Sequence, residues 1–423
     1  MKHLSRRPQS AARTIVLACL LGALASGAAH AQTSPYYLRA SQTFSYDSNL
    51  FRVPDAAGTE SDVISTTALT VGLDQPISRQ RLLASATVRG NAYRDNSELN
   101  GAGYDLLLGL DWEAASKLSG TARITASQSQ AGFESYGGLA QPQSGRNQER
   151  SRLVDLRGQY GGASVLTLEA QANLTDISYS STGFASRERE SAMLGAGLRW
   201  RPGGPWSFGL MLRRTDGEYP RFSAIAGADE YTRNDVDLTA EFLPTGASRL
   251  SARITHTDEQ HDLDASRDFS GVTGELRWNY QATGKLSFMT LLARETGSGS
   301  STTTQLIPGG DETTTYLTDS RLTNRLGLQA DWEATAKIRV TANFDYSRDF
   351  YDTQFLDGSG VVAGNRRGYS RRVGLTAGYA ITRVWTLQCG LSRLSRDSGV
   401  TLGGQSYAYD ANTASCSATL ALQ

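Results

Sequence analysis

The chain has 423 residues, and its 42 Lys and Arg side chains balance 42 Asp and Glu, so its formal net charge is zero. This balance argues against nucleic acid as a partner, because a phosphate-binding surface needs an excess of basic residues. The hydrophobic content of 39% and the negative mean hydropathy exclude a helical membrane protein. They do not exclude a β-barrel, in which apolar residues alternate with polar ones.

The first residues have the pattern of a targeting segment. Residues 1–13 carry four Lys and Arg side chains and no acid, and residues 14–29 form an apolar run. An A-x-A pattern that ends at Ala31 is typical of a secretory cleavage site. We therefore expect residues 1–31 to be a signal peptide cleaved after Ala31, and residues 32–423 to form the mature domain.

The mature chain alternates apolar and polar residues in segments about as long as membrane-spanning strands. Counting from residue 36 to residue 422 gives 18 such segments. One segment presents on a single face Tyr104, Leu106, Leu108, Leu110 and Trp112.

The connections between these segments are short and long in turn. Short turns fall near 74–79, 114–118, 161–164, 202–205, 243–248, 282–285, 334–336 and 381–384. Longer polar loops fall near 47–62, 95–102, 131–148, 179–190, 215–232, 257–270, 295–318, 348–368 and 395–409. The pattern predicts an all-β fold, a transmembrane antiparallel up-and-down barrel of 16–18 strands, most simply 18, with short periplasmic turns and long external loops. The expected location is the outer membrane of a Gram-negative cell, with membrane lipid around the barrel.

All six tryptophans lie close to a short turn on the apolar face. They are Trp112, Trp200, Trp206, Trp278, Trp332 and Trp385. Amphipathic rings collect at membrane–water interfaces, so these residues are expected to form an aromatic girdle at the periplasmic end.

The polar residues between the apolar ones are expected to line a lumen. The candidates are Arg89, Arg123, Arg157, Arg199, Arg213, Arg253, Arg277, Arg325, Arg339, Arg372, Asp111, Asp237, Glu275 and Asp331. A barrel of this size encloses an aqueous channel unless something plugs it, and the long loop 295–318 is a candidate constriction. The opposite charges can neutralise one another and stiffen the wall, or they can form a polar route for an anionic or hydroxyl-rich solute.

Two cysteines remain in the mature chain, Cys389 and Cys416, both on the lipid-facing parity of the last two strands. A hairpin symmetric about position 402.5 places them opposite one another, close enough for a disulfide. The alternative is a pair of small apolar side chains packed against lipid. Either role is structural.

The histidines give little support for an enzyme. His256 and His261 do not form the zinc-binding H-E-x-x-H pattern, and their spacing on a strand points the rings to opposite faces. An acid–His pair with Asp258, Glu259 or Asp262 is conceivable, but the sequence shows no second group to orient the ring. We therefore expect no catalytic residues, no cofactor and no metal site.

Residues 36–55 read YYLRASQTFSYDSNLFRVPD, and this opening strand and loop precede a series of Trp-marked hairpins. Together with the signal peptide, these features resemble the β-barrel porins encoded with exopolysaccharide biosynthesis genes, including those beside exosortase systems. The resemblance implies an outer-membrane protein that acts in exopolysaccharide export, with a polysaccharide substrate and periplasmic export machinery as partners. One departure is the chain end at residues 420–423, LALQ, which lacks the terminal aromatic residue common in such barrels.

The expected function is therefore an outer-membrane conduit, formed or supported by the barrel, for an exopolysaccharide. A general or solute-specific diffusion porin is the alternative. A surface-binding scaffold and an outer-membrane hydrolase are further alternatives from other classes.

Overall fold

The structure of the chain is a computed structural model. It describes residues 34–422 with gaps at 56–57, 115–116, 134–144, 163, 224–226, 264, 297–304, 307–311, 314–320, 358–359, 398–400, 403–404 and 407. The expected signal peptide lies outside the described residues, so cleavage after Ala31 stays a prediction. Most of loop 295–318 also lies outside them, and its role as a constriction stays a prediction too.

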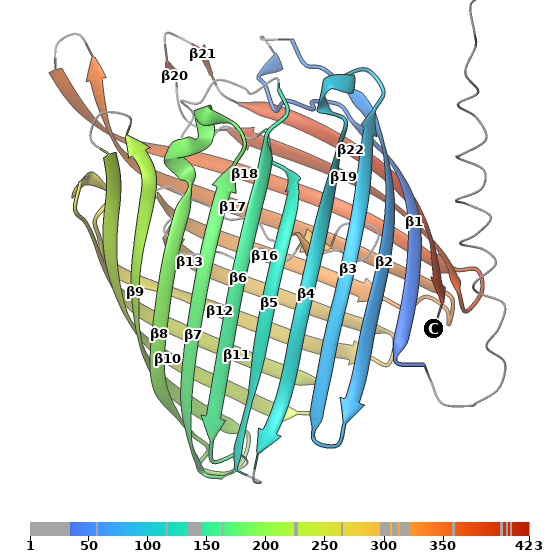
Figure 1. The fold of residues 1–423 in the computed structure, drawn as a ribbon, viewed down its shortest axis with the longest axis vertical. Coiled ribbons are helices and arrows are strands. Elements are labelled where there is room, and N and C mark those ends of the chain that lie inside the picture. The colour runs from blue at the N-terminus through green and yellow to red at the C-terminus, as the bar shows by residue number, and fades with distance from the viewer. Residues whose placement is uncertain are drawn as a thin grey trace, which may run out of the picture.

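The chain forms one closed antiparallel barrel of 18 strands, which confirms the fold class and the strand number (Figure 1). Each strand pairs with the next, and β1 pairs with both β2 and the final strand β22, which closes the barrel. The strands are β1 (Tyr36–Asp47), β2 (Asp62–Ile77), β3 (Gln80–Tyr93), β4 (Gly101–Ala114), β5 (Leu118–Gln130), β6 (Gln148–Tyr160), β7 (Leu166–Tyr179), β8 (Arg189–Trp200), β9 (Trp206–Ser223), β10 (Gly227–Thr245), β11 (Ser248–His261), β12 (Phe269–Thr283), β13 (Leu286–Thr296), β16 (Arg321–Trp332), β17 (Ile338–Asp357), β18 (Gly360–Ala380), β19 (Trp385–Asp397) and β22 (Tyr409–Leu422).

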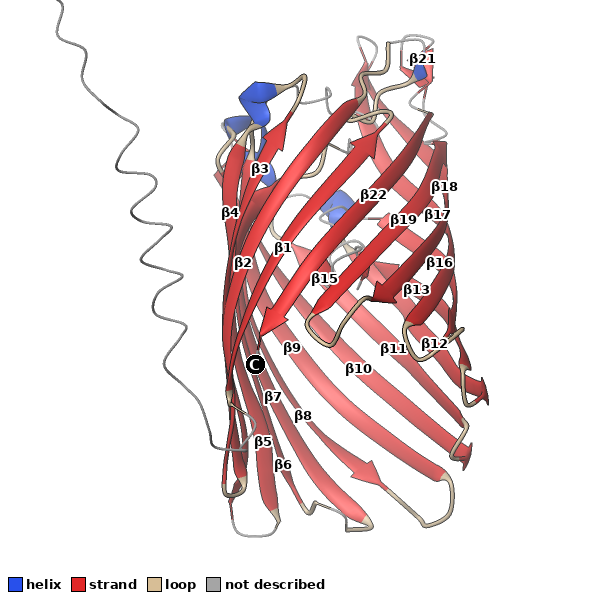
Figure 2. Cartoon of the chain, turned by 90° about the vertical axis from the view of Figure 1, so that its right-hand side faces the viewer, coloured by secondary structure: helices blue, strands red, loops and turns tan. Residues whose placement is uncertain are grey.

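The long loops carry small elements of their own. Two short hairpins consist of β14 (Gln305–Leu306) with β15 (Glu312–Thr313), and β20 (Thr401–Leu402) with β21 (Gln405–Ser406). The described residues also include the 3₁₀ helices η2 (Ser97–Leu99), η3 (Thr182–Arg187) and η4 (Ala265–Arg267), and Figure 2 shows helices toward the end opposite the short turns. None of the helices in the described part of the chain is long and apolar enough to cross a membrane.

Two of the expected loops, 215–232 and 348–368, are instead mostly paired strand, which continues the hairpins β9–β10 and β17–β18. β9 and β10 extend to Ser223 and Gly227, and β17 and β18 extend to Asp357 and Gly360. Gly and Pro residues in these stretches are typical of turns, but the strand pairing tolerates them. Gly217 lies opposite Tyr231, and a Cβ on Gly217 would lie 2.4 Å from the Tyr231 ring.

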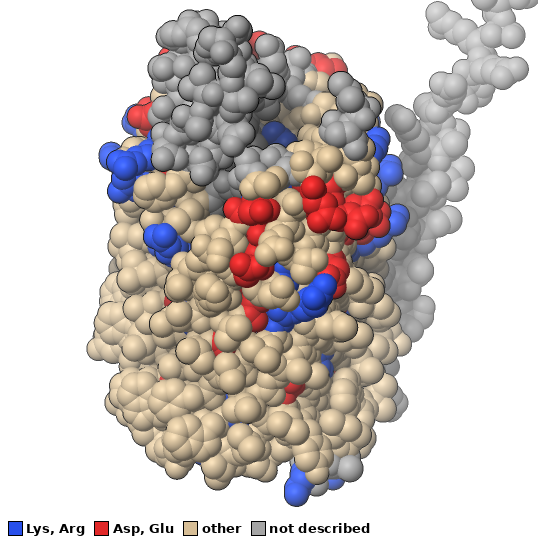
Figure 3. All heavy atoms as spheres, turned by 90° about the vertical axis from the view of Figure 1, so that its left-hand side faces the viewer, with Lys and Arg blue, Asp and Glu red and all other residues tan. Residues whose placement is uncertain are grey.

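The outer face of the barrel is apolar over most of its height. Side chains along β8 alternate between exposed and less exposed, and Leu194 on its outer face is 69% exposed. Exposed aliphatic side chains at every second position are typical of a wall that faces lipid. Figure 3 shows few charged atoms on the lower wall of one side and a charged patch above it.

The six tryptophans lie at the end of the barrel that carries the short turns. Trp200 ends β8 and Trp206 begins β9, and the turn between them uses Gly203 and Gly204 with positive φ angles of 99° and 70°. A non-glycine residue would be strained at such angles, so the tight turn depends on these glycines. The arrangement agrees with an interfacial girdle at this end.

Cys389 and Cys416 form a disulfide between β19 and β22, with a Cα–Cα distance of 4.1 Å. Neighbours of the same parity, such as Leu387 and Leu391, are exposed on the outer face. The bond therefore lies on the outer side of the wall and joins the last two strands, beside the point where β22 meets β1.

Candidate functional site

The inner wall of the barrel is polar and encloses a cavity of ≈ 970 Å³. Its lining comes from residues between β2 and β13, and charged and hydroxyl side chains predominate on the inward parity. The predicted lumen residues occupy this parity, opposite to the exposed aliphatic side chains. This inner wall is the candidate functional site.

Most of the predicted lumen arginines lie beside a carboxylate, on a neighbouring strand, on the same strand or in an adjoining turn. Three of these pairs join Arg123 to Asp111 at 2.5 Å, and Arg199 to Glu169 and Arg325 to Asp345 at 2.6 Å. The others are Arg89 with Asp105, Arg157 with Asp155 (3.0 Å), Arg213 with Asp237 (2.6 Å), Arg253 with Glu275 (3.9 Å), Arg277 with Glu275 (3.1 Å) and Arg339 with Glu333 (2.5 Å). We call this set the ion-pair ladder.

Two predicted lumen residues have other surroundings. Asp331 accepts hydrogen bonds from the Thr341 hydroxyl at 2.6 Å and the Gln329 amide at 2.7 Å. Arg372 lies opposite Asp345 in the β17–β18 register, so it shares that carboxylate's neighbourhood with Arg325.

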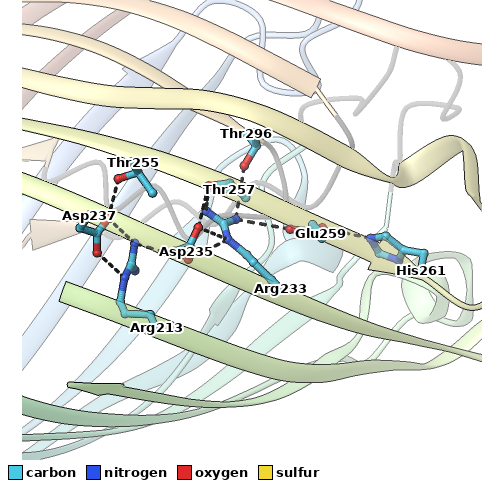
Figure 4. A network of polar contacts seen from close by, with 9 residues as sticks. All are labelled: Arg213, Arg233, Asp235, Asp237, Thr255, Thr257, Glu259, His261 and Thr296. Atoms are coloured by element: carbon cyan, nitrogen blue, oxygen red, sulfur yellow. Dashed lines mark hydrogen bonds and ion pairs between the residues drawn. The ribbon is translucent and has the colours of Figure 1, made fainter. Parts of the chain in front are cut away.

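The densest part of the ladder lies on β9, β10 and β11 (Figure 4). Asp235 and Asp237 are two residues apart on β10, so both point to the same side of the sheet. The Arg213 guanidinium donates to Asp237 at 2.6 Å and lies 3.4 Å from Asp235. The hydroxyls of Thr255 and Thr257 donate to Asp237 at 2.5 Å and to Asp235 at 2.6 Å.

Arg233 extends the same network toward the external end of the barrel. Its guanidinium donates to Asp235 at 3.0 Å, to Glu259 at 3.4 Å and to the Thr296 hydroxyl at 3.3 Å. Buried carboxylates are stable only when they are paired and hydrogen-bonded. Asp235 and Glu259 satisfy that condition, and the guanidinium between them is fixed in place.

His261 ends this network and is almost fully buried. Its Nδ1 lies 2.9 Å from Asp229, and its Nε2 lies 3.0 Å from Glu259. Both ring nitrogens therefore face carboxylates, and neither is left to take a proton from a substrate. His256 lies on the outer parity and is exposed. The geometry therefore does not favour the acid–His pair of a hydrolase.

The loop between β11 and β12 is held against the same wall. Arg267 in η4 donates to Asp229 at 2.7 Å, and its guanidinium lies 4.0 Å from the centre of the Tyr219 ring and 4.8 Å from that of Phe222. The Leu263 amide also donates to Asp229 at 3.0 Å. Helix η4 contacts β17, although β12, β13 and β16 lie between the two around the barrel. The loop therefore bends inward and narrows the external mouth.

Asp229, Arg233 and Arg267 are not predicted from the sequence, because they fall in or beside the expected external loops. Glu259 is one of the three acids considered as a partner of His261, and the structure places it 3.0 Å from the ring. The alternation of Asp229, Tyr231, Arg233 and Asp235 on one parity is the signal that predicts a continuing inward face.

Within the described residues, no group of three or more His, Cys, Asp or Glu side chains is arranged to hold a metal ion. The inner wall therefore offers arginines, carboxylates and hydroxyls as its chemistry. Arginine, carboxylate and hydroxyl groups are in general donors and acceptors of hydrogen bonds.

No family model and no curated protein matches the chain. Among solved structures, it is similar to the outer membrane protein OpdK from Pseudomonas aeruginosa, with 12% identity, a TM-score of 0.48 and coverage of 92% of this chain and 99% of that chain. For OccK2 (OpdF) from the same organism, the identity is 13%, the TM-score 0.48 and the coverage 92% and 97%. For the siderophore receptor PirA from Acinetobacter baumannii, the values are 8%, 0.46, 93% and 81%. Similarity at this level does not identify a family or a substrate.

Proposed function

We propose that the chain is an outer-membrane channel that passes small polar solutes through its lumen. The observation that carries the proposal is the cavity of ≈ 970 Å³ inside a closed barrel, with the ion-pair ladder on its wall. The apolar outer face gives the barrel a lipid-facing surface, and the polar inner face gives a solute a route through it.

The pairing in the ladder indicates which solutes the route favours. Each guanidinium beside a carboxylate presents donors and acceptors close together but little net charge. A solute rich in hydroxyl groups can form hydrogen bonds with the guanidinium and with the carboxylate. A simple ion is neither strongly attracted nor strongly repelled, because the opposite charges largely cancel. We therefore infer a preference for small hydroxyl-rich or zwitterionic solutes and weak selection between cations and anions.

Export of an exopolysaccharide is a narrower form of this proposal, supported by the resemblance of residues 36–55. The inward loop that carries η4 argues for small solutes instead, because a long polymer needs an unobstructed mouth. The diffusion porin is therefore the form that we favour.

The test is single-channel conductance of refolded residues 32–423 in a planar bilayer, with heat-dependent gel mobility as the control for folding. We expect a stable conductance that mono- and disaccharides interrupt in proportion to their concentration. A folded barrel with no conductance would contradict the channel. Interruption by acidic polysaccharide fragments, but not by small sugars, would favour the export function over the porin.

A further inference from the structure

The outer wall carries a furrow across β5 to β8. Four small residues are direct neighbours in a row on these strands, namely Gly120, Gly158, Ala170 and Ala196. With neighbouring strands about 4.8 Å apart, the row spans about 14 Å. The cavity at this place measures ≈ 860 Å³ and is lined mostly by apolar groups.

Large side chains border the furrow on both sides, although on the external side Ala172 separates two of them. The next row toward the short turns contains Tyr160, Leu168, Leu198 and Leu210 as direct neighbours on β6 to β9. Leu156 and Leu194 stand on the other side. Small residues between large ones let an elongated apolar group approach the backbone closely. The shape therefore fits a hydrocarbon chain.

Trp112 lies at one end of the furrow. Its ring covers Gly120, where a Cβ would lie 2.6 Å from the ring. The other end reaches Leu212, and the same cavity is lined beyond it by Arg214 and Asn234. The furrow therefore rises from the tryptophan girdle to a charged region near the external loops.

That charged region is a row of outward-facing residues on β6 to β10, visible as the patch in Figure 3. Arg152, Asp176, Glu190, Glu218 and Glu230 are direct neighbours in that order. Like charges that face each other on adjacent strands destabilise a sheet. Arg152 compensates Asp176 at one end of the row, while Glu190, Glu218 and Glu230 adjoin one another, so cations from outside the chain would stabilise this part of the row.

Two arginines stand among these carboxylates with their side chains in solvent. Arg152 is 70% exposed and lies 3.4 Å from Asp176, and Arg214 is 61% exposed and lies 2.9 Å from Asp216. Guanidinium groups bind phosphate strongly, and carboxylate and phosphate oxygens are the preferred ligands of Mg²⁺ and Ca²⁺. A phosphorylated surface that brings divalent cations complements both kinds of side chain.

We propose that the furrow and the charged row above it bind one molecule of lipopolysaccharide from the outer leaflet. One acyl chain lies along Gly158, Ala170 and Ala196. A phosphate group contacts Arg152 or Arg214, and divalent cations bridge other phosphates to the carboxylate row. This inference rests on the proposed function, because it requires that the barrel lie in the outer membrane.

A second copy of the chain is a poorer occupant. A two-fold interface brings the same patch of each copy together, so the carboxylate rows would face one another. Lipopolysaccharide brings the phosphates and cations that such an interface lacks.

The test measures lipopolysaccharide bound per barrel after extraction from outer membranes in a mild detergent with Mg²⁺. The variant Ala170→Leu fills the furrow, and Ala342→Leu is its matched control, because Ala342 is an exposed alanine on the outer parity of β17. We expect Ala170→Leu to lower the bound amount about tenfold, which corresponds to about 1.4 kcal/mol, and Ala342→Leu to leave it unchanged. The double variant Arg152→Gln/Arg214→Gln and removal of divalent cations with EDTA should each lower it as well.

Equal retention by Ala170→Leu and Ala342→Leu, with both barrels folded, would overturn the inference. So would retention of phospholipid in place of lipopolysaccharide, or a wild-type dimer that Ala170→Leu dissociates. If Ala170→Leu does not fold, the arginine double variant decides, and undiminished binding by that variant counts against the site. Conductance separates the two proposals: a conducting barrel without bound lipopolysaccharide overturns only this inference. A folded barrel that binds it without conducting overturns only the channel.

Discussion

Arg213 and Arg214 are consecutive residues of β9, yet they lie on opposite sides of the barrel wall. Arg213 faces the lumen with 19% of its side chain exposed, beside Asp235 and Asp237, which are almost fully buried. Arg214 faces outward with 61% exposed, and its partner Asp216 is 60% exposed. The same pair of residue types therefore occurs in two environments one residue apart.

The difference shows that burial determines how much an ion pair contributes to stability. In a buried pair, loss of one partner leaves an uncompensated charge away from water, at a cost of about 3–5 kcal/mol. In an exposed pair, water takes the place of the partner, and the measured value is about 0–1 kcal/mol. The inner pairs therefore hold the wall together, while the outer charges remain available to bind molecules at the surface.

The largest expected effect comes from removing a carboxylate of the buried ion pairs. Asp235→Ala removes an acceptor of Arg213, Arg233 and Thr257, so we expect the free energy of unfolding to fall by about 3–5 kcal/mol. Asp216→Ala is the exposed counterpart and should change it by less than about 1 kcal/mol. Unfolding in denaturant, followed by gel mobility, measures both. Equal losses from the two variants would show that the lumen solvates its charges as bulk water does.

A second effect concerns the covalent bond on the outer face. Cys389 and Cys416 are 27 residues apart in sequence, and closing a loop of that size stabilises a protein by about 3.5 kcal/mol in the chain-entropy description. We expect Cys389→Ala to lower the free energy of unfolding by about that amount and to leave conductance unchanged, because the bond lies outside the lumen. A reductant added to the wild type should reproduce the loss. A change in conductance would mean that the outer bond sets the geometry of the inner wall.

The alternation of apolar and polar residues made the barrel predictable from the sequence. The inner network was less predictable, because strands with the composition of turns contribute to it. The segment from Tyr104 to Trp112 alternates without interruption, and the structure has β4 there. In β9, by contrast, Gly217 and Pro220 have the composition of a turn, but packing of the Tyr231 ring over Gly217 keeps the strand paired. Tertiary contacts of this kind cannot be seen in local composition.

The buried network could be predicted only in part for the same reason. Arg213 and Asp237 were identified by parity alone. The sequence indicates Glu259 as a possible partner of His261, and the structure places it 3.0 Å from the ring. The second partner, Asp229, is not predicted, because it lies in the expected loop 215–232. The strand register that brings Asp229 within reach of His261 depends on the full length of the β9–β10 hairpin.

A third prediction uses the two arginines to test where ions travel. Arg213→Gln leaves Asp235 and Asp237 with less compensation in the lumen, so we expect cation selectivity to rise. A unit charge at 4 Å in water is worth about 1 kcal/mol, which is about fivefold in local cation concentration. Arg214→Gln should leave selectivity unchanged. The reversal potential in a salt gradient measures both, and equal shifts would contradict the assignment of Arg213 to the conducting path.

The smallest effect concerns a buried carboxylate that amide groups hold in place. Asp62 lies at the external end of β2, is 1% exposed, and accepts hydrogen bonds from the backbone amides of Arg94, Asp95 and Asn96 and from the Asn96 side chain. Burial raises the pKa of its carboxyl, but these hydrogen bonds together outweigh burial, and the pKa is lowered below its usual value of 3.8.

Because the pKa is lower in the folded state, the stabilisation from Asp62 is fully present above the pKa of the unfolded chain. It is lost as the pH falls through the lower, folded value. We therefore expect Asp62→Asn to reduce hydrogen-exchange protection of the amides at Arg94 to Asn96 at neutral pH, by about 1 kcal/mol or less. In acid below the folded pKa, the variant and the wild type should converge. A difference that persists unchanged into acid would mean that the shape of the side chain, and not its charge, holds this loop. Amide donors would then not replace an arginine as the partner of a buried carboxylate.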